Sequence, residues 1–186
     1  MPYRALLLDR DGIVNVDHGY VGGRERFDFM DGIFDLTRHA ADRGFRIAVV
    51  TNQSGIARGY YTEAEFLDLS AWMCGAFRAR GVELAGVFHC PYHRGGSVAR
   101  YARDSFWRKP NPGMILEAAR RLDLDLSRSV FLGDQPTDME AAQAAGVGLR
   151  ALLSEAGGPS AEVPTAIMSA ASISIRRLTD LMPYLR

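Results

Sequence analysis

Two aspartates near the start of the chain, Asp9 and Asp11, follow an apolar run at residues 6–8 and precede Gly12. A short apolar run bounded by a turn signal predicts a buried strand. The carboxyl end of such a strand faces the ligand crevice of an open α/β sheet. Two carboxylates there repel each other, and a bound cation would offset the repulsion. The alternative is a solvated acidic turn, which this pair alone does not exclude.

Lys109 is the only lysine among the 22 basic residues of the chain, and all the others are arginines. Lysine carries a compact point charge whose pKa responds to its surroundings, whereas arginine stays charged and binds through a planar fork. The single exception in so arginine-rich a chain makes Lys109 a candidate for a specific chemical role.

The overall composition is that of a globular domain with no strong charge. The 186 residues fit one domain with a sizeable core, 47% of them are hydrophobic, and the net charge is zero. No global field favours nucleic acid, and no apolar run is long enough to span a membrane. Two cysteines, Cys74 and Cys90, are too few for a disulfide framework. We expect a monomeric cytoplasmic enzyme or binding domain.

Hydrophobic periodicity and turn residues predict strands that alternate with helices. Strands are expected at residues 6–8, 45–50, 86–89, 129–132 and 148–153, with a weak one at 165–168. Helices are expected at about 31–43, 62–80, 112–122, 137–145 and 175–185, with Thr62 and Glu65 forming a capping box. Turn or irregular structure is expected at 51–55, 90–112 and 154–164. This alternation predicts an α/β fold with a parallel sheet and helices on both faces.

Side chains capable of chemistry recur where these strands end. They are Asp9 and Asp11 after the first strand, Thr51 and Asn52 after the second, Asp134 and Asp138 after the fourth, and Lys109 before the helix that leads into the fourth. Because the carboxyl ends of parallel strands share one edge of the sheet, these side chains should converge. Carboxylate oxygens suit Mg²⁺, which commonly bridges protein carboxylates to a substrate phosphate. The sequence therefore predicts a Mg²⁺ and phosphate site.

These residues also carry a family resemblance. The four motifs are Asp9-Arg10-Asp11-Gly12, Val49-Val50-Thr51-Asn52, Arg108-Lys109-Pro110, and Gly133-Asp134 with Asp138. In order and position they resemble the motifs of the haloacid dehalogenase (HAD) superfamily of phosphotransferases. The resemblance implies a Rossmann-like, HAD-like fold, and the short spacings leave little room for a cap domain. Residues 1–186 are expected to form a single HAD-like phosphatase domain.

The resemblance implies a catalytic role for five of these residues. Asp9 would be the nucleophile that forms an aspartyl-phosphate. Asp11 would protonate the leaving alcohol and then activate the water that hydrolyses the intermediate. Thr51, Asn52 and Lys109 would hold the transferring phosphoryl group and offset its charge.

The resemblance also implies how a metal would be held. Asp9, Asp134 and the main-chain carbonyl of Asp11 would ligate Mg²⁺. Asp138 would orient Lys109 from outside the ligand set. The alternative for Asp138 is a first-turn acid that only interacts with the positive end of its helix dipole.

Loops next to the motifs make the resemblance more specific. Residues 15–21 and 51–59, with Cys90-Pro91 and residues 108–114, closely resemble the D-glycero-D-manno-heptose 1,7-bisphosphate 7-phosphatase family. The resemblance implies removal of the 7-phosphate in the supply of ADP- or GDP-heptose precursors. The residues it places against the sugar or its phosphates are Asp17, His18, Gly19, Tyr20, Gln53, Ser54, Arg108 and Gln135.

Several alternatives stay open. Histidinol-phosphate phosphatases share the Thr-Asn-Gln-Ser-Gly run, so histidinol phosphate or another small sugar phosphate is a second candidate substrate. A non-catalytic phosphate-binding protein is disfavoured because all four motifs are intact. His18 could be an ordinary exposed loop histidine. Gln135 stands where relatives often carry a substrate-facing lysine, which leaves the preferred substrate and anomer open.

The long stretch at 90–112 departs from the family pattern. Relatives usually hold a structural zinc there through a Cys-x-His pair and a later Cys-x-Cys pair. Here Cys90 is kept and His93 lies nearby, but Tyr92 stands at the expected histidine. Ser105 and Trp107 replace the later cysteines, and a structural zinc site needs four ligands. We predict no zinc, with the stretch held by packing of Tyr92, Tyr101, Phe106 and Trp107.

Overall fold

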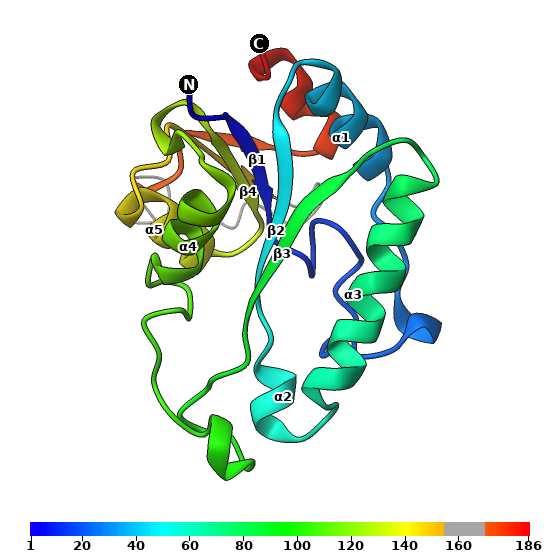
Figure 1. Ribbon diagram of the computed structural model, residues 1–186, viewed down its shortest axis with the longest axis vertical. Helices are drawn as coiled ribbons and strands as arrows, with labels where there is room; N and C mark the ends of the chain where they lie inside the picture. The colour runs from blue at the N-terminus through cyan, green and yellow to red at the C-terminus, as the bar shows by residue number, and fades with distance from the viewer. Residues whose placement is uncertain (155–169) are drawn as a thin grey trace.

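The computed structural model describes residues 1–154 and 170–186, and these residues form one six-stranded sheet with the order β3-β2-β1-β4-β5-β6. The strands are β1 (Ala5–Leu8), β2 (Arg46–Asn52), β3 (Leu84–Cys90), β4 (Val130–Gly133), β5 (Leu149–Leu153) and β6 (Ile173–Ile175). Every neighbouring pair is parallel (Figure 1). The predicted α/β class with a Rossmann-like parallel sheet is confirmed.

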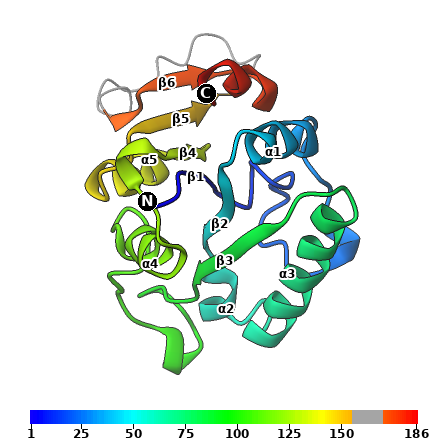
Figure 2. The ribbon, with the colours of Figure 1, turned by 45° about the horizontal axis from the view of Figure 1, so that its top comes forward.

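Helices cover both faces of this sheet. They are α1 (Ile33–Asp42), α2 (Ser54–Arg58), α3 (Glu63–Arg78), α4 (Gly113–Leu122) and α5 (Pro136–Ala144). Figure 2 shows α1 and α3 on one face and α4 and α5 on the other. Short 3₁₀ turns complete the fold at Arg24–Arg26, Ala99–Tyr101, Leu126–Arg128 and Leu178–Tyr184. No helix among the described residues is both long and apolar enough to cross a membrane.

The core consists of two layers because successive strand residues face opposite sides of the sheet. Along β1, Leu6 and Leu8 pack into the layer under α1 and α3. Ala5 and Leu7 pack into the layer under α4 and α5. Burial on both faces explains why the strand reads as a continuous apolar run rather than an alternating one. The buried strand holds the residue that follows it, Asp9, at a fixed place.

Local signals set the starts of the helices. The predicted capping box of α3 is present: Glu65 N donates to Thr62 Oγ1 at 3.1 Å, and Thr62 N donates to Glu65 Oε2 at 2.6 Å. After β4, α5 begins with Pro136, and Gln135 N donates to Asp138 Oδ2 at 3.1 Å. That second bond fixes Asp138 in the first turn of α5.

Three predicted elements need comment. The expected turn at 51–55 is wrong, because β2 continues to Asn52 and Ser54–Arg58 forms α2. The expected last helix at 175–185 is also wrong: β6 pairs with β5, and the 3₁₀ turn Leu178–Tyr184 follows. Leu178 and Leu181 are both buried, and their three-residue spacing is the period of a 3₁₀ helix. The weak strand predicted at 165–168 lies outside the described residues.

Candidate active site

The predicted site residues gather at the carboxyl ends of three adjacent strands. β1 lies between β2 and β4, and the chain leaves β1 toward one side and returns to β4 on the other. Such a reversal of strand order opens a crevice at the carboxyl edge of a parallel sheet. Asp9 follows β1, Thr51 and Asn52 end β2, and Asp134 follows β4. The predicted convergence is therefore present.

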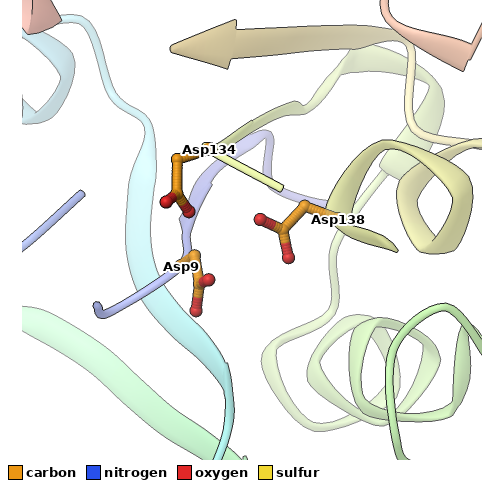
Figure 3. A group of neighbouring side chains, drawn as sticks. All are labelled: Asp9, Asp134 and Asp138. Carbon is orange, nitrogen blue, oxygen red and sulfur yellow. The ribbon is translucent and has the colours of Figure 1, made fainter. Parts of the chain in front are cut away.

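Three carboxylates, those of Asp9, Asp134 and Asp138, form the centre of this crevice. One oxygen from each lies within 4.8 Å of the others, and no other such group of acidic, histidine or cysteine side chains occurs among the residues that the structure describes. Figure 3 shows Asp138 reaching from α5 toward Asp9 and Asp134. Oδ1 of Asp134 is buried and has no hydrogen-bond partner, as expected for a metal ligand.

The electrostatics of this group favour a cation. Burial, followed by the neighbouring carboxylates, raises the pKa of Asp9 to about 8, although Lys109 opposes the shift. Burial and the charge of Asp138 raise the pKa of Asp134 to about 6, against a hydrogen bond from Gln135. Both carboxyls therefore resist ionisation while no cation is present. Hard oxygen donors under mutual repulsion fit Mg²⁺.

Glycines make room for two of these carboxylates. Gly12 has a φ of +85°, and a Cβ there would lie 2.4 Å from Oδ2 of Asp134. A Cβ on Gly133 would lie 2.4 Å from Oδ2 of Asp138. Any side chain at either place would push a carboxylate out of the group, so both motifs require glycine.

Lys109 is the cation of the site and is only 2% exposed. Its Nζ lies 2.6 Å from Asp138 Oδ1 and 3.0 Å from Asp9 Oδ1, and it donates to the carbonyl of Val50 at 2.9 Å. Burial lowers the pKa of Lys109, but Asp138 and Asp9 together outweigh it and raise the pKa above its ordinary value. The predicted contact between Asp138 and Lys109 is present.

The side chain of Asn52 binds the main chain of Lys109. Its Nδ2 donates to the Lys109 carbonyl at 3.0 Å, and its Oδ1 accepts from the Lys109 N–H at 3.0 Å. Both polar atoms of the Asn52 side chain are thus used within the protein. A contact from Asn52 to a phosphoryl oxygen, as predicted, would therefore have to come from its backbone N–H.

Asp11 lies beside the three-carboxylate group but does not belong to it. Its carboxylate accepts from Arg10 through Nε at 3.2 Å and Nη2 at 2.9 Å, and from Asn15 Nδ2 at 3.1 Å. Gln53 Nε2 donates to it at 3.0 Å. With its side chain held in this way, Asp11 keeps its main-chain carbonyl as the atom expected at the metal.

A cavity of about 480 Å³ opens above these residues. It is lined by Asp9, Asp11, Asp17, Tyr20, Thr51, Asn52, Ser54, Arg108, Lys109, Asp134, Gln135, Thr137 and Asp138. An adjoining hollow of about 350 Å³ adds Gly19, Gly55 and Tyr61. Most residues predicted to touch the sugar or its phosphates thus face one continuous space.

Two of the predicted substrate residues lie elsewhere. His18 Nε2 lies 2.8 Å from Asp28 Oδ2, and its side chain is 41% exposed outside both cavities. This placement favours the alternative of an ordinary loop histidine. Gln53 is buried beneath the cavity and bonds to Asp11, Thr51 and Tyr61. Its amide faces the protein rather than the space for a sugar.

Two arginines next to the site were not predicted. Arg10 is almost completely buried and holds Asp11 from behind. Arg58 lies with its guanidinium 5.9 Å from the ring of Tyr20. Two buried nitrogens have no hydrogen-bond partner: Nε of Arg58 and Nη1 of Arg108. Burial lowers the pKa of Arg108, and the charge of Arg58 lowers it further. Arginine is so abundant in this chain that neither residue stood out.

The long stretch after β3 is held partly as predicted. The rings of Tyr92 and Tyr101 pack with centroids 6.0 Å apart, and Tyr101 Oη donates to Glu63 Oε2 at 2.7 Å. Phe106, in contrast, is 60% exposed, so its predicted packing role is wrong. Trp107 is 36% exposed and contributes only in part.

The two potential zinc ligands of this stretch have other contacts. Burial raises the pKa of the Cys90 thiol, whose Sγ lies 3.9 Å from the Tyr92 carbonyl. His93 Nδ1 accepts a hydrogen bond from the N–H of Gly95 at 3.0 Å. The absence of zinc stays a prediction, and metal analysis of the purified protein tests it.

Comparison with known proteins connects this geometry to one family. The chain is 45% identical over 185 residues to the D-glycero-alpha-D-manno-heptose-1,7-bisphosphate 7-phosphatase of Burkholderia mallei, covering 100% of this chain and 95% of that protein. The chain belongs to the HAD-like heptose-bisphosphate phosphatase family. The HAD-hydrolase-like family description matches residues 106–174, which include the third and fourth motifs.

Other members of the heptose-bisphosphate phosphatase family agree with this assignment. The D-glycero-beta-D-manno-heptose-1,7-bisphosphate 7-phosphatase of Escherichia coli K12 is 48% identical over 149 residues, 80% of this chain and 78% of that protein. The D,D-heptose 1,7-bisphosphate phosphatase of B. bronchiseptica, complexed with magnesium and phosphate, superposes with a TM-score of 0.79 at 26% identity, over 98% of this chain and 97% of that one. These family members are named for both anomers.

Proposed function

We propose that the protein is a Mg²⁺-dependent phosphatase that removes the 7-phosphate of D-glycero-D-manno-heptose 1,7-bisphosphate, in the supply of ADP- or GDP-heptose precursors. The carrying observation is the group of Asp9, Asp134 and Asp138, in which a buried Asp134 oxygen lacks any partner and Lys109 lies at hydrogen-bond distance from the other two. Relatives named for this reaction match the whole chain.

In the proposed reaction, a carboxylate oxygen of Asp9 attacks the phosphorus as the bond to the sugar oxygen breaks. Asp11 gives its proton to that oxygen, so the sugar leaves as a neutral alcohol. Asp11 then takes a proton from the water that attacks the phosphorus of the aspartyl-phosphate, which releases inorganic phosphate and restores Asp9. Thr51 and the Asn52 N–H hold the phosphoryl oxygens throughout, and the nearby positive charge of Lys109, whose three N–H donors are used within the protein, offsets their charge.

The residues present fit a magnesium ion. Asp9, Asp134 and the main-chain carbonyl of Asp11 would hold it, and Mg²⁺ supplies a positive charge that offsets the charge of the phosphoryl group. Asp138 stays outside this set in our proposal, because Lys109 and the Gln135 N–H occupy its two oxygens. Lys109, fixed from three sides, keeps Asp9 in place for the attack.

The distal phosphate of the substrate is proposed to meet Arg108 and Arg58. Both side chains have buried nitrogens without a partner, and planar guanidinium groups bind phosphate through paired hydrogen bonds. The sugar itself would contact Asp17, Gly19, Tyr20 and Ser54, which line the same space. Gln135, also in that lining, would contact the phosphate end in place of a lysine.

We further propose that the protein acts as a monomeric, cytoplasmic, single-domain enzyme with an open site. Between β1 and α1 the chain forms only a 3₁₀ turn and isolated bridges, and between β2 and β3 only α2 and α3. The connections at the mouth of the site are thus loops and a short helix. Substrate selection would come from these loops.

The decisive experiment measures phosphate release from both anomers of heptose 1,7-bisphosphate and from histidinol phosphate, with Mg²⁺ and with EDTA. We expect kcat/KM for one heptose anomer to exceed that for histidinol phosphate by about 100-fold. The reverse order would replace the proposed substrate by histidinol phosphate. No Mg²⁺-dependent release from these substrates or from any of a panel of other phosphorylated metabolites would leave a phosphate-binding protein without catalysis.

A further inference from the structure

Gln53 is buried between the phosphate-binding end of β2 and the proton-transferring aspartate, with 1% of its surface exposed. Its Nε2 donates to Thr51 Oγ1 at 2.8 Å and to Asp11 Oδ2 at 3.0 Å. Its Oε1 accepts from the Tyr61 hydroxyl at 2.5 Å. One amide thus contacts three side chains, two of which take part in the proposed reaction.

The orientation of this amide follows from its partners. Once Asp11 has given up its proton, its carboxylate only accepts hydrogen bonds, so the NH₂ group of Gln53 must face Asp11 in that state. The opposite orientation would set Oε1 against the carboxylate of Asp11. Burial raises the pKa of Tyr61 to about 12, so its hydroxyl keeps a proton to donate to Oε1. Asp11 thus selects the orientation of the amide, and the hydrogen bond from Tyr61 to Oε1 supports it.

This arrangement orders two functional groups at once. Because Thr51 Oγ1 accepts from Gln53, its own hydroxyl hydrogen is free to point into the cavity, which Thr51 lines. Asp11 Oδ2 accepts from Gln53 and from Nε and Nη2 of Arg10, while Arg10 Nη2 and Asn15 Nδ2 hold Oδ1. A carboxylate fixed at both oxygens cannot rotate away from the leaving group, which lowers the cost of reaching the productive geometry.

The ring of Tyr61 occupies a slot that two glycines create. A Cβ on Gly22 would lie 2.4 Å from the ring, and a Cβ on Gly55 would lie 2.3 Å from it. Gly22 belongs to the loop after β1 and Gly55 to α2, so the ring is packed against both segments. The hydroxyl that orients Gln53 is therefore positioned by the packing of the loop and of α2.

We propose that Gln53 is a positioning residue for proton transfer by Asp11, held in place by Tyr61, and not a contact of the sugar. The proposal rests on the proposed function, since it takes Asp11 as the acid that protonates the leaving alcohol. Gln53 touches no reacting atom and acts only through Asp11 and Thr51. Loss of its amide should therefore impair proton delivery more than substrate binding.

The test compares two substrates that differ in their need for a proton. The leaving group of heptose 1,7-bisphosphate is a sugar alcohol, which needs the proton of Asp11. The leaving group of p-nitrophenyl phosphate is the stable p-nitrophenolate ion, which needs no proton. In Gln53→Met, which keeps the size of the side chain, we expect kcat/KM for the heptose substrate to fall about 100-fold. For p-nitrophenyl phosphate we expect less than about a tenfold loss, from the Thr51 contact alone.

Three further variants keep the interpretation sharp. Gln143→Met makes the same chemical change at an exposed position of α5 and should behave as the wild type. Asp11→Asn should show the same substrate dependence as Gln53→Met, with a larger loss. Tyr61→Phe keeps the ring in its slot and removes only the hydroxyl, so we expect a loss of about threefold to tenfold, again larger for the heptose substrate.

The outcomes separate this proposal from the proposed function. If the wild type hydrolyses neither substrate, the proposed function is wrong. If the wild type hydrolyses both substrates and Gln53→Met lowers kcat/KM by the same factor for both, the positioning role is overturned. A lower kcat/KM that comes only from a higher KM overturns it as well. If Gln53→Met does not fold, Tyr61→Phe decides the question, because a loss equal on the two substrates would contradict the proposal.

Discussion

The residues at the end of β2, together with Lys109, differ from two arginines beside the site, Arg58 and Arg108, in how completely their polar atoms are paired. Lys109, Asn52 and Gln53 are bonded on every side by neighbouring protein groups. In contrast, Arg58 at the end of α2 and Arg108 before α4 keep buried nitrogens without partners. The first region is thus assembled before a substrate arrives, whereas the second has donors left for one. We expect changes in the first region to affect turnover and changes in the second to affect binding.

The largest effect is expected from Asp9→Asn. The neutral amide cannot attack phosphorus, so kcat should fall by at least about 10⁴-fold. The variant should melt at a higher temperature than the wild type in EDTA at pH 8, because a carboxylate whose pKa is raised to about 8 by burial is replaced by a neutral group. Turnover and thermal melts measure both effects. Asp35→Asn, on the exposed side of α1, is the matched control, and near-normal turnover of Asp9→Asn would contradict the covalent mechanism.

Metal removal should make stability depend on pH. The folded-state pKa values of Asp9 and Asp134, about 8 and about 6, lie above the ordinary value of 3.8. The unfolded chain therefore releases these protons first, and stability without metal should fall as pH rises from about 4 to about 8. We expect the Tm in EDTA to drop by several degrees between pH 5.5 and pH 8, and Mg²⁺ to restore it at pH 8. Equal melting temperatures in EDTA at pH 5.5 and pH 8 would show that folding does not raise the pKa values of these carboxyls.

In the second region, Arg58→Gln and Arg108→Gln should each raise KM for the bisphosphate by about tenfold with kcat nearly unchanged. A monophosphate substrate lacks the distal group and should be affected far less. Steady-state kinetics on both substrates measure the contrast, with the exposed Arg100→Gln as control. A fall in kcat alone would instead place these arginines with the motif residues and erase the distinction between the two regions.

The smallest effect is expected from His18→Ala. Its ring contacts Asp28 at the surface and lines neither cavity. We expect kcat and KM to stay within about twofold of the wild type, as is usual for a surface substitution away from a site. A tenfold rise in KM would show that the loop brings His18 to the sugar when substrate binds.

Much of the fold could be predicted because its signals are local. β1 is a continuous apolar run, and α3 begins at a capping box. β6 was missed because its three residues become a strand only by pairing with β5. α2 was missed because its turn-like sequence becomes helical where Gly55, Ile56 and Ala57 are buried. In both places tertiary contacts outweigh local preference.

The site could be predicted where topology alone brings residues together. Asp9, Thr51 and Asp134 each stand at a strand end, so a parallel sheet must place them side by side. The roles of Arg10 and Tyr61 could not be found in this way. Their function depends on the side chains that they contact, Asp11 and Gln53. The loops that bring these residues together have no periodic sequence pattern from which the contacts could be predicted.

The contacts of Asn52 have a consequence for how this protein can change over evolution. Asn52 pairs with Cys90 at the end of β3, and its amide holds the main chain of Lys109. Residues 91–108 therefore begin and end beside one residue, and between these ends Tyr101 bonds to Glu63 and Val98 to the carbonyl of Ala57. We expect that the part of this segment outside these contacts can be lengthened, shortened or exchanged without moving Lys109. Natural recombination, or grafting in the laboratory, can thus change what the enzyme selects while the reaction stays the same.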